Sequence, residues 1–135
     1  MISIERATQL ADARRRLRID WEPVAGDRFV MPNTEVDGVF VVAEMTIEIA
    51  ELASGRLIRF NGTTEWALDS IPASEVLWLP RESQLRASLG AAFARLERLP
   101  DAPGGWAVVL TDGSRHVDVD AEDAYARALA SRWSG

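Results

Sequence analysis

Few residues of this chain could carry out catalysis, and the first of them is the only histidine, His116. A serine, His116 and an acid could form a hydrolytic triad, but the sequence has no Gly-x-Ser-x-Gly segment that would present a serine nucleophile. His116 lies in residues 114–119, which end in alternating polar and apolar side chains, and we read this segment as a strand of a hairpin. We expect His116 at a polar, outward-facing position of that strand, with no catalytic role.

Two carboxylates four residues apart, Glu65 and Asp69, are weak candidates for acid–base or metal chemistry. Acids at this spacing arise by chance in an acidic chain, and the segment has no clear helical pattern that would place both on one face. We therefore predict no cofactor and no metal site. A small carboxylate- or metal-dependent hydrolase stays open as an alternative function.

The residues that are missing exclude whole classes of enzyme. All 15 residues counted as lysine or arginine are arginine, and the chain has no cysteine. A P-loop and a Schiff-base enzyme each need a lysine. Thiol nucleophiles, iron–sulfur clusters and cysteine-ligated zinc need cysteine, and zinc proteases of the paired-histidine kind need a second histidine. The same composition, rich in arginine and alanine, favours a GC-rich bacterial genome, and selection against lysine modification is the alternative explanation.

The charge balance disfavours nucleic acid as a partner. The chain has 21 acidic residues against the 15 arginines, a net charge of −6, and phosphate backbones bind mainly to cations. Arg14, Arg15 and Arg16 end a predicted helix, where they suit the negative end of its dipole. Two alternatives stay open: a contact of these three arginines with an anion or an acidic partner, and a weak nucleic-acid contact through Arg14–Arg18.

Tryptophan is the side chain used in excess, with five copies. Three of them lie in apolar segments and are expected in the core. Trp21 and Trp133 lie near the ends of predicted elements, where a half-exposed indole could anchor a partner protein. Edge packing within the chain is the competing explanation for both.

Four acids gather near the C-terminus, at Asp118, Asp120, Glu122 and Asp123. They suggest a calcium loop, but the glycine and the closing glutamate of an EF-hand are missing. Asp120 and Asp123 have the spacing of a capping box. We therefore expect helix capping and a solvated turn here.

The pattern along the chain predicts helices at both ends and in the middle. Ser3 is a candidate N-cap for a helix over residues 3–16, and Asp120 begins a helix over 121–133. Pro80 opens a third, whose apolar stripe continues through Leu89 to Leu99, with Gly90 tolerated inside it.

Strands are predicted between these helices. The expected strands cover residues 28–31, 39–43, 46–51, 56–60 and 63–68, followed by a short helical turn from Ser70 to Val76, and a hairpin covers 106–111 and 115–119. If Ala53 and Ser54 form the turn, Ile47 faces Phe60, Glu48 faces Arg59 and Ile49 faces Ile58. The predicted fold is therefore a single two-layer α+β domain over residues 1–135: N-terminal helix, antiparallel β-meander, central helix, β-hairpin and C-terminal helix.

Several segments resemble a family of short actinobacterial proteins that often carry the label of a pilus assembly protein. The segments are residues 21–23 and 26–29, 60–70, 78–86 without residue 83, and 121–125. A weaker likeness, through the Trp-Leu-Pro and Gln-Leu of residues 78–85, is to short phage and prophage proteins. Both resemblances imply the layout given above, and neither implies an activity. The proteins that properly bear the pilus label are similar to ParA-like ATPases, which need the lysine that this chain lacks.

These features together predict a non-catalytic protein-interaction or accessory protein rather than an enzyme. Its expected partner is another protein, or a second copy of itself in a homodimer, with contact through a sheet edge or an aromatic patch. No segment has the length and apolar character of a membrane span, and the N-terminal residues lack the pattern of a secretory signal. We expect a cytoplasmic protein without membrane contact.

Overall fold

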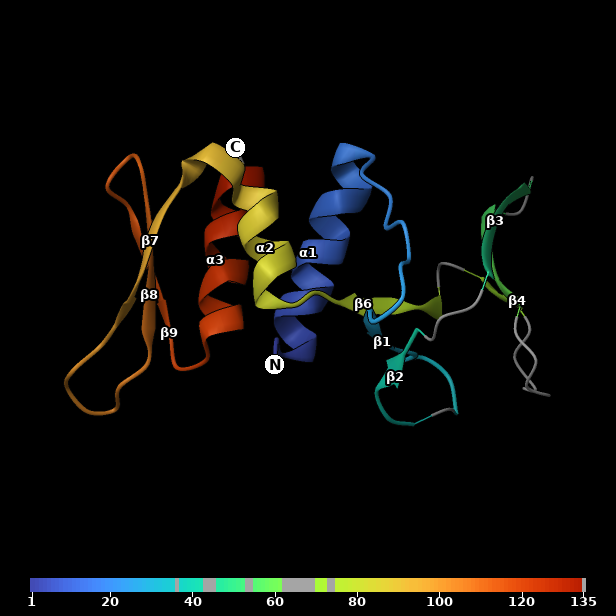
Figure 1. Cartoon of the computed structure of the whole chain (residues 1–135), viewed down its shortest axis with the longest axis horizontal. Coiled ribbons are helices and arrows are strands. Elements are labelled where there is room, and N and C mark those ends of the chain that lie inside the picture. The colour runs from blue at the N-terminus through green and yellow to red at the C-terminus, as the bar shows by residue number, and fades with distance from the viewer. Residues whose placement is uncertain (36, 43–45, 53–54, 62–69, 73–74, 135) are drawn as a thin grey trace. The chain divides into compact units, whose positions relative to one another are not determined.

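The computed structural model describes residues 1–35, 37–42, 46–52, 55–61, 70–72 and 75–134 (Figure 1). The chain divides into two compact units. The helical unit comprises Met1–Asp20 and Leu79–Gly135, and the strand unit comprises Trp21–Trp78. The expectation of a single domain over 1–135 stays a prediction.

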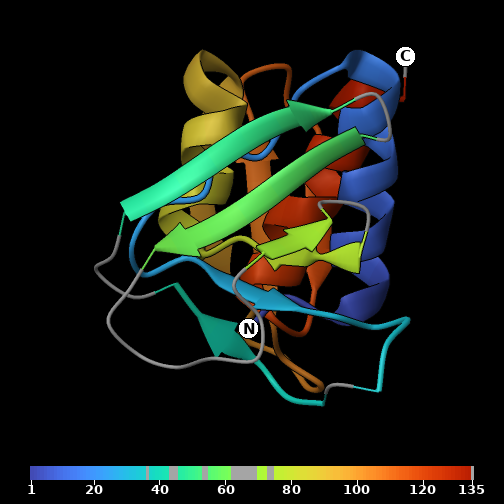
Figure 2. The same ribbon diagram turned by 90° about the vertical axis from the view of Figure 1, so that its right-hand side faces the viewer.

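The helical unit places helices against one antiparallel sheet. Its helices are α1 (Ile4–Leu17), α2 (Glu82–Leu89), η2 (Gly90–Ala92) and α3 (Ala121–Trp133), and its sheet has the order β7 (Phe93–Arg98), β8 (Trp106–Leu110), β9 (Arg115–Asp118). Helix α3 contacts β8, β9, α1 and α2. Figure 2 shows α3 between the other two helices, so α3 is the element on which this unit is assembled.

Helix α1 forms because its ends are capped and one side is apolar. Ser3 accepts a hydrogen bond from the Arg6 N–H, as expected of an N-cap. Ala7, Leu10 and Ala13 recur at helical spacing and are buried. The predicted helices at both ends of the chain are confirmed, each within one or two residues of the expected bounds.

The prediction of one long central helix was wrong beyond Leu89. Gly90 adopts φ +57°, which side chains rarely adopt, and its N–H closes the helix on the Arg86 carbonyl. The chain then runs through a short 3₁₀ turn into β7, which pairs with β8 from Phe93 to Arg98. The apolar residues 93 and 96 fit a strand as well as a helix, and pairing with β8 decides between the two.

The predicted hairpin is confirmed as β8 and β9, and β7 makes it a three-stranded sheet. Its inner face, with Val108, packs beneath α3. On its outer face Glu97 accepts hydrogen bonds from Arg95 (2.5 Å) and Arg115 (2.6 Å), which lie on the strands at either side of β8. Arg95 and Arg115 lie directly opposite Val109 on β8, from the strands at its two sides. Val109 is on the same face of the sheet as this bridge and is 4% exposed.

The strand unit contains two further sheets. One has the order β2 (Phe40–Val41), β1 (Arg28–Val30), β6 (Leu77–Leu79), and the other has the order β3 (Thr46–Leu52), β4 (Gly55–Asn61), β5 (Ser70–Pro72). The last residue of β6, Leu79, already belongs to the helical unit. The long strands β3 and β4 lie side by side in Figure 2. Their register places Ile47 opposite Phe60, Glu48 opposite Arg59 and Ile49 opposite Ile58, which confirms the predicted pairing. The expected meander is thus divided between two sheets.

The core of the strand unit is aromatic. Phe29, Met31 and Val42 are buried, with Trp21, Phe40 and Val76 packed on them. Trp21 stacks on Trp78 at 5.9 Å between ring centroids, and its indole N–H donates to the buried carboxylate of Asp27. Asp27 also accepts the Val24 N–H, so this carboxylate holds the chain before β1 and the tryptophan together.

The α+β fold class is confirmed, with a helix near each end of the chain. The helical turn expected at Ser70 was wrong for its first residues, because Ser70–Pro72 forms β5 by pairing with β4. The strand expected over residues 63–68 lies outside the described residues, as do Glu65 and Asp69.

Candidate functional site

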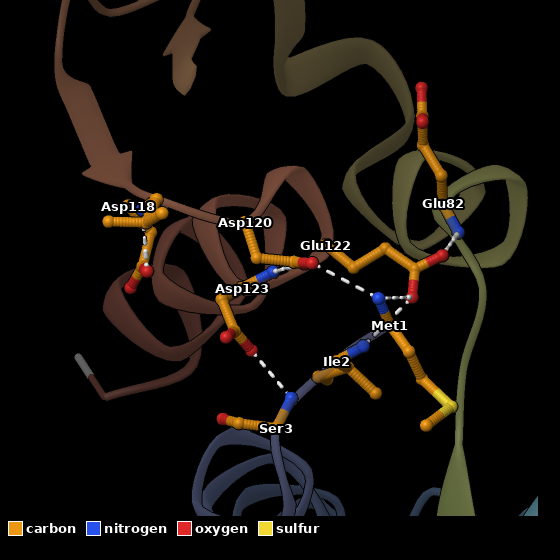
Figure 3. A network of polar contacts seen from close by, with 9 residues as sticks. Met1, Ile2, Ser3, Glu82, Asp118, Asp120, Glu122 and Asp123 are labelled. Carbon is orange, nitrogen blue, oxygen red and sulfur yellow. Dashed lines mark hydrogen bonds and ion pairs between the residues drawn. The ribbon is translucent and has the colours of Figure 1, made fainter. Parts of the chain in front are cut away.

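The N-termini of all three α-helices in the helical unit meet at three acidic residues, Asp120, Glu122 and Asp123, which we call the acidic clamp (Figure 3). Asp120 is the N-cap of α3 and accepts a hydrogen bond from the Asp123 N–H at 3.1 Å. The Asp123 carboxylate accepts from the Ser3 N–H at 2.8 Å. The capping role predicted for this acidic segment is confirmed, and the clamp extends it to two other helices.

Glu122 joins the other two helices to α3. One of its carboxylate oxygens accepts the Ile2 N–H at 2.9 Å, and the other accepts the Glu82 N–H of α2 at 3.0 Å (Figure 3). The Met1 ammonium group pairs with Asp120 at 3.0 Å. Helix N-termini attract negative charge because their first N–H groups have no partner within the helix. The clamp therefore fixes α1 and α2 against α3.

Beside the clamp, α1, β9 and α3 border an open hollow of about 330 Å³, which we call the basic hollow. Helix α1 is held there by the clamp, and β9 lies against α3. The hollow is lined by Arg6, Gln9, His116, Arg127, Ala130, Ser131 and Ser134. Its lining therefore combines cationic side chains with amide and hydroxyl groups.

The two arginines of the hollow share one carboxylate. A terminal nitrogen of Arg6 lies 4.0 Å from Asp118, and one of Arg127 lies 3.9 Å from the same carboxylate oxygen. Both distances exceed hydrogen-bond length. Arg6 also donates to Gln9 at 3.1 Å, and Arg127 donates to the Val117 carbonyl at 3.0 Å. These bonds hold the two guanidinium groups at the hollow and leave a net positive charge on the pair and its carboxylate.

His116 lies on the side of the sheet that α3 covers, where it lines this open hollow and is half-buried, so the prediction of an outward-facing position was wrong. Its ring nitrogen Nε2 lies 3.1 Å from the Ser114 hydroxyl. Burial lowers the pKa of His116 below its usual 6.5, Asp112 opposes that shift and Arg127 adds to it. Polar and apolar side chains alternate along β9 as expected, but the exposed side is the one with Val117. Val119, just after the strand, is exposed as well.

The Ser114–His116 contact does not have the arrangement of a hydrolytic triad. In a triad the acid orients the histidine that activates the serine. Here the Asp112 carboxylate accepts the Ser114 N–H at 2.8 Å, so it bonds to the serine side of the pair and closes the turn between β8 and β9. The contact between Ser114 and His116 is therefore part of the turn that joins β8 to β9.

The predicted binding residues belong to both units, and within the helical unit Arg14 and Trp133 contact each other. Arg14 is 7% exposed and lies over the Trp133 ring at 5.7 Å, where burial lowers its pKa to about 10. Arg15 pairs with Asp12 at the surface, and Arg16 is exposed. Trp133 is half-buried, and Trp21 belongs to the core of the strand unit. Binding of a partner through Trp21, Trp133 or the three arginines stays a prediction.

Sequence reasoning missed Arg6 and Arg127. Each looks like an ordinary polar position on a helix surface, and the two lie near opposite ends of the chain. The available signal was the acidic segment at residues 118–123, because helix N-termini and arginines are the groups that gather around acids.

Within the described residues, no group of three or more histidine, cysteine, aspartate or glutamate side chains is placed to hold a metal ion. Among the described helices, none is long and apolar enough to cross a membrane. Comparison of the chain with protein-family models, curated proteins and solved structures gives no match. The resemblance to the short actinobacterial family stays a prediction.

Proposed function

We propose that this chain is a non-catalytic accessory protein that binds another protein, and that its basic hollow receives a carboxylate of that partner. The observation that carries the proposal is the convergence of Arg6 and Arg127, from two different helices, on one open hollow. The whole chain has a net charge of −6, whereas the lining of this hollow includes two arginines and no acidic residue.

The size and lining of the hollow favour a side chain or a chain terminus as its occupant. Its volume of about 330 Å³ is near the lower end of small-molecule pockets, which enclose roughly 300–1,000 Å³. The hollow is open to the surface, so it admits a group carried by a larger molecule. Gln9 and Ser131 add neutral hydrogen-bonding groups that could orient such a carboxylate.

Asp118 reduces the repulsion between the two arginines of the hollow while no partner is bound. It offsets part of the charge of Arg6 and Arg127 from 4.0 and 3.9 Å without forming a short hydrogen bond to either. A carboxylate that reaches about 2.8 Å forms charge-assisted hydrogen bonds, which are roughly twice as strong as neutral ones. The partner's acid therefore competes favourably with Asp118 for the same guanidinium groups.

A binding role fits the described part of the chain better than a catalytic one. The nearest approach to a catalytic arrangement there is Ser114 with His116, and Asp112 bonds to the serine instead of orienting the histidine. The cytoplasm is the compartment that we propose, because no cysteine is present to form disulfides.

The first test is affinity capture of partners from host lysate with three forms of the chain: wild type, R6A/R127A and the control R115A/R132A. The control removes the same number of positive charges, at exposed positions on β9 and α3 that lie outside the hollow. We expect one stoichiometric partner that is retained by the control and lost with R6A/R127A. Equal capture by all three forms would refute the role of the hollow.

A second test needs no known partner. The single histidine gives one set of imidazole signals in NMR, and acetate serves as the carboxylate probe. We expect acetate to raise the pKa of His116 in the wild type and to leave it unchanged in R6A/R127A, because a bound anion stabilises the imidazolium. An unchanged His116 pKa in the wild type at saturating acetate would count against a carboxylate site.

A further inference from the structure

The strand β7 lies at the edge of its sheet, with β8 on one side. The Leu99 N–H donates to the Gly105 carbonyl at 2.9 Å. In an antiparallel ladder, hydrogen-bonded pairs recur at every second residue. Arg95 and Glu97 are therefore bonded to β8, and the backbone groups of Leu96 and Arg98 point away from it, to the open edge.

This edge is complementary to itself. If a second β7 lies antiparallel with Leu96 opposite Leu96, Arg95 of each copy lies opposite Glu97 of the other. Leu96 and its equivalent then form the hydrogen-bonded pair, because their backbone groups are the ones directed at the edge. The register that matches the charges is also the register that matches the backbone hydrogen bonds.

The side chains on this edge are placed for such a pairing. Arg95 and Glu97 lie on the outer face of the sheet with 60% and 30% of their side chains exposed. Leu96 lies on the other face and is half-buried. Charged residues protect an edge strand from unspecific pairing. Because Arg95 and Glu97 carry opposite charges two residues apart, a reversed copy of the strand would place each of them opposite its counter-charge.

We propose that two copies of this chain associate through their β7 strands, antiparallel and with Leu96 opposite Leu96, so that three strands from each copy form one continuous sheet. We choose a second copy as the partner of this edge because its Glu97 and Arg95 lie opposite Arg95 and Glu97 of the first copy. The proposal is independent of the basic hollow, which lies on α1, β9 and α3.

The test is analytical ultracentrifugation over a concentration series with wild type, R95E and E97R. We expect the wild type to reach twice the monomer mass. R95E places Glu opposite Glu in both cross-copy pairs and E97R places Arg opposite Arg, so each variant alone is expected to be monomeric. When the two variants are mixed in equal amounts, Glu residues of R95E lie opposite Arg residues of E97R in both cross-copy pairs. We expect this mixture to form a heterodimer.

A backbone variant gives an independent readout. In Leu96→Pro the lost N–H is one that points to the open edge, so the ladder to β8 keeps its hydrogen bonds. We expect a monomer with an unchanged far-ultraviolet circular dichroism spectrum. The control Arg132→Glu changes an exposed charge on α3, outside the sheet, and is expected to remain dimeric.

Two outcomes overturn the proposal: a wild type that is monomeric at every concentration, or a dimer that survives in both R95E and L96P. If the variants do not fold, amide hydrogen exchange of the wild type decides instead. Protection of the Leu96 and Arg98 amides that rises with protein concentration supports the pairing, and protection independent of concentration refutes it.

Discussion

Replacing Glu122 tests whether the acidic clamp holds the helices of the helical unit together. The Glu122 carboxylate is 16% exposed and accepts hydrogen bonds from Ile2 and from Glu82, at the start of α1 and α2. Glu122→Ala removes both acceptors and leaves two backbone N–H groups in a partly buried site. A hydrogen bond to a charged group contributes about 1.5–3 kcal/mol, and water can replace part of that contribution here. We expect a loss of about 2–3 kcal/mol in the free energy of unfolding.

The assay is urea denaturation followed by far-ultraviolet circular dichroism, which reports on the three helices that the clamp joins. The loss is read from the shift of the midpoint at constant slope. Glu5→Ala is the matched control, because Glu5 lies in the first turn of α1 but is exposed. Loss of its interaction with the helix dipole is expected to cost about 0.3–1 kcal/mol. If Glu122→Ala costs no more than the control, the clamp does not fix the helices and the reasoning is refuted.

Three further predictions concern single positions. A Cβ at Gly105 would lie 2.5 Å from the Asp118 carbonyl oxygen, whereas one at Gly104 meets no atom within 4 Å, and both glycines have positive φ. By denaturation we expect Gly105→Ala to cost about 1–3 kcal/mol more than Gly104→Ala, and equal losses would contradict the close approach. Burial raises the pKa of Tyr125, the only tyrosine, above 10. Its absorbance at 295 nm should therefore titrate above pH 10, and stability should fall as the pH rises from 10 through the folded pKa, because the unfolded state loses the proton first; titration at or below 10 would refute this. The pKa of His116 is lowered by burial, so stability should fall as the pH drops from 6.5 through its folded pKa, where the unfolded state binds the proton first. NMR titration of its imidazole checks the direction, and a pKa at or above 6.5 would contradict it.

The sequence alone predicted those features of the fold that depend on local pattern. Ser3 and Asp120 cap helices where expected, since a side-chain oxygen next to the first helical N–H groups acts over a few residues. The pairing of β3 with β4 was also predictable, because the alternation of apolar and charged residues selects one register.

The central helix shows where local pattern fails. Residues 85–99 fit a helical stripe throughout, yet Gly90 ends the helix and residues 93–98 pair with β8. Apolar residues at positions 93 and 96 are compatible with either structure. Their state is decided by hydrogen bonding to the backbone of β8, which no periodicity in the segment itself reveals.

The exclusion of lysine- and cysteine-dependent chemistry follows from the sequence by itself, because it rests on counts. The location of the basic hollow was decided by the tertiary structure. Arg6, His116 and Arg127 lie far apart along the chain and meet because both α1, which the acidic clamp joins to α3, and β9 pack against α3. Residue types determine which chemistry is possible, and the packing of helices and strands determines which of those residues meet.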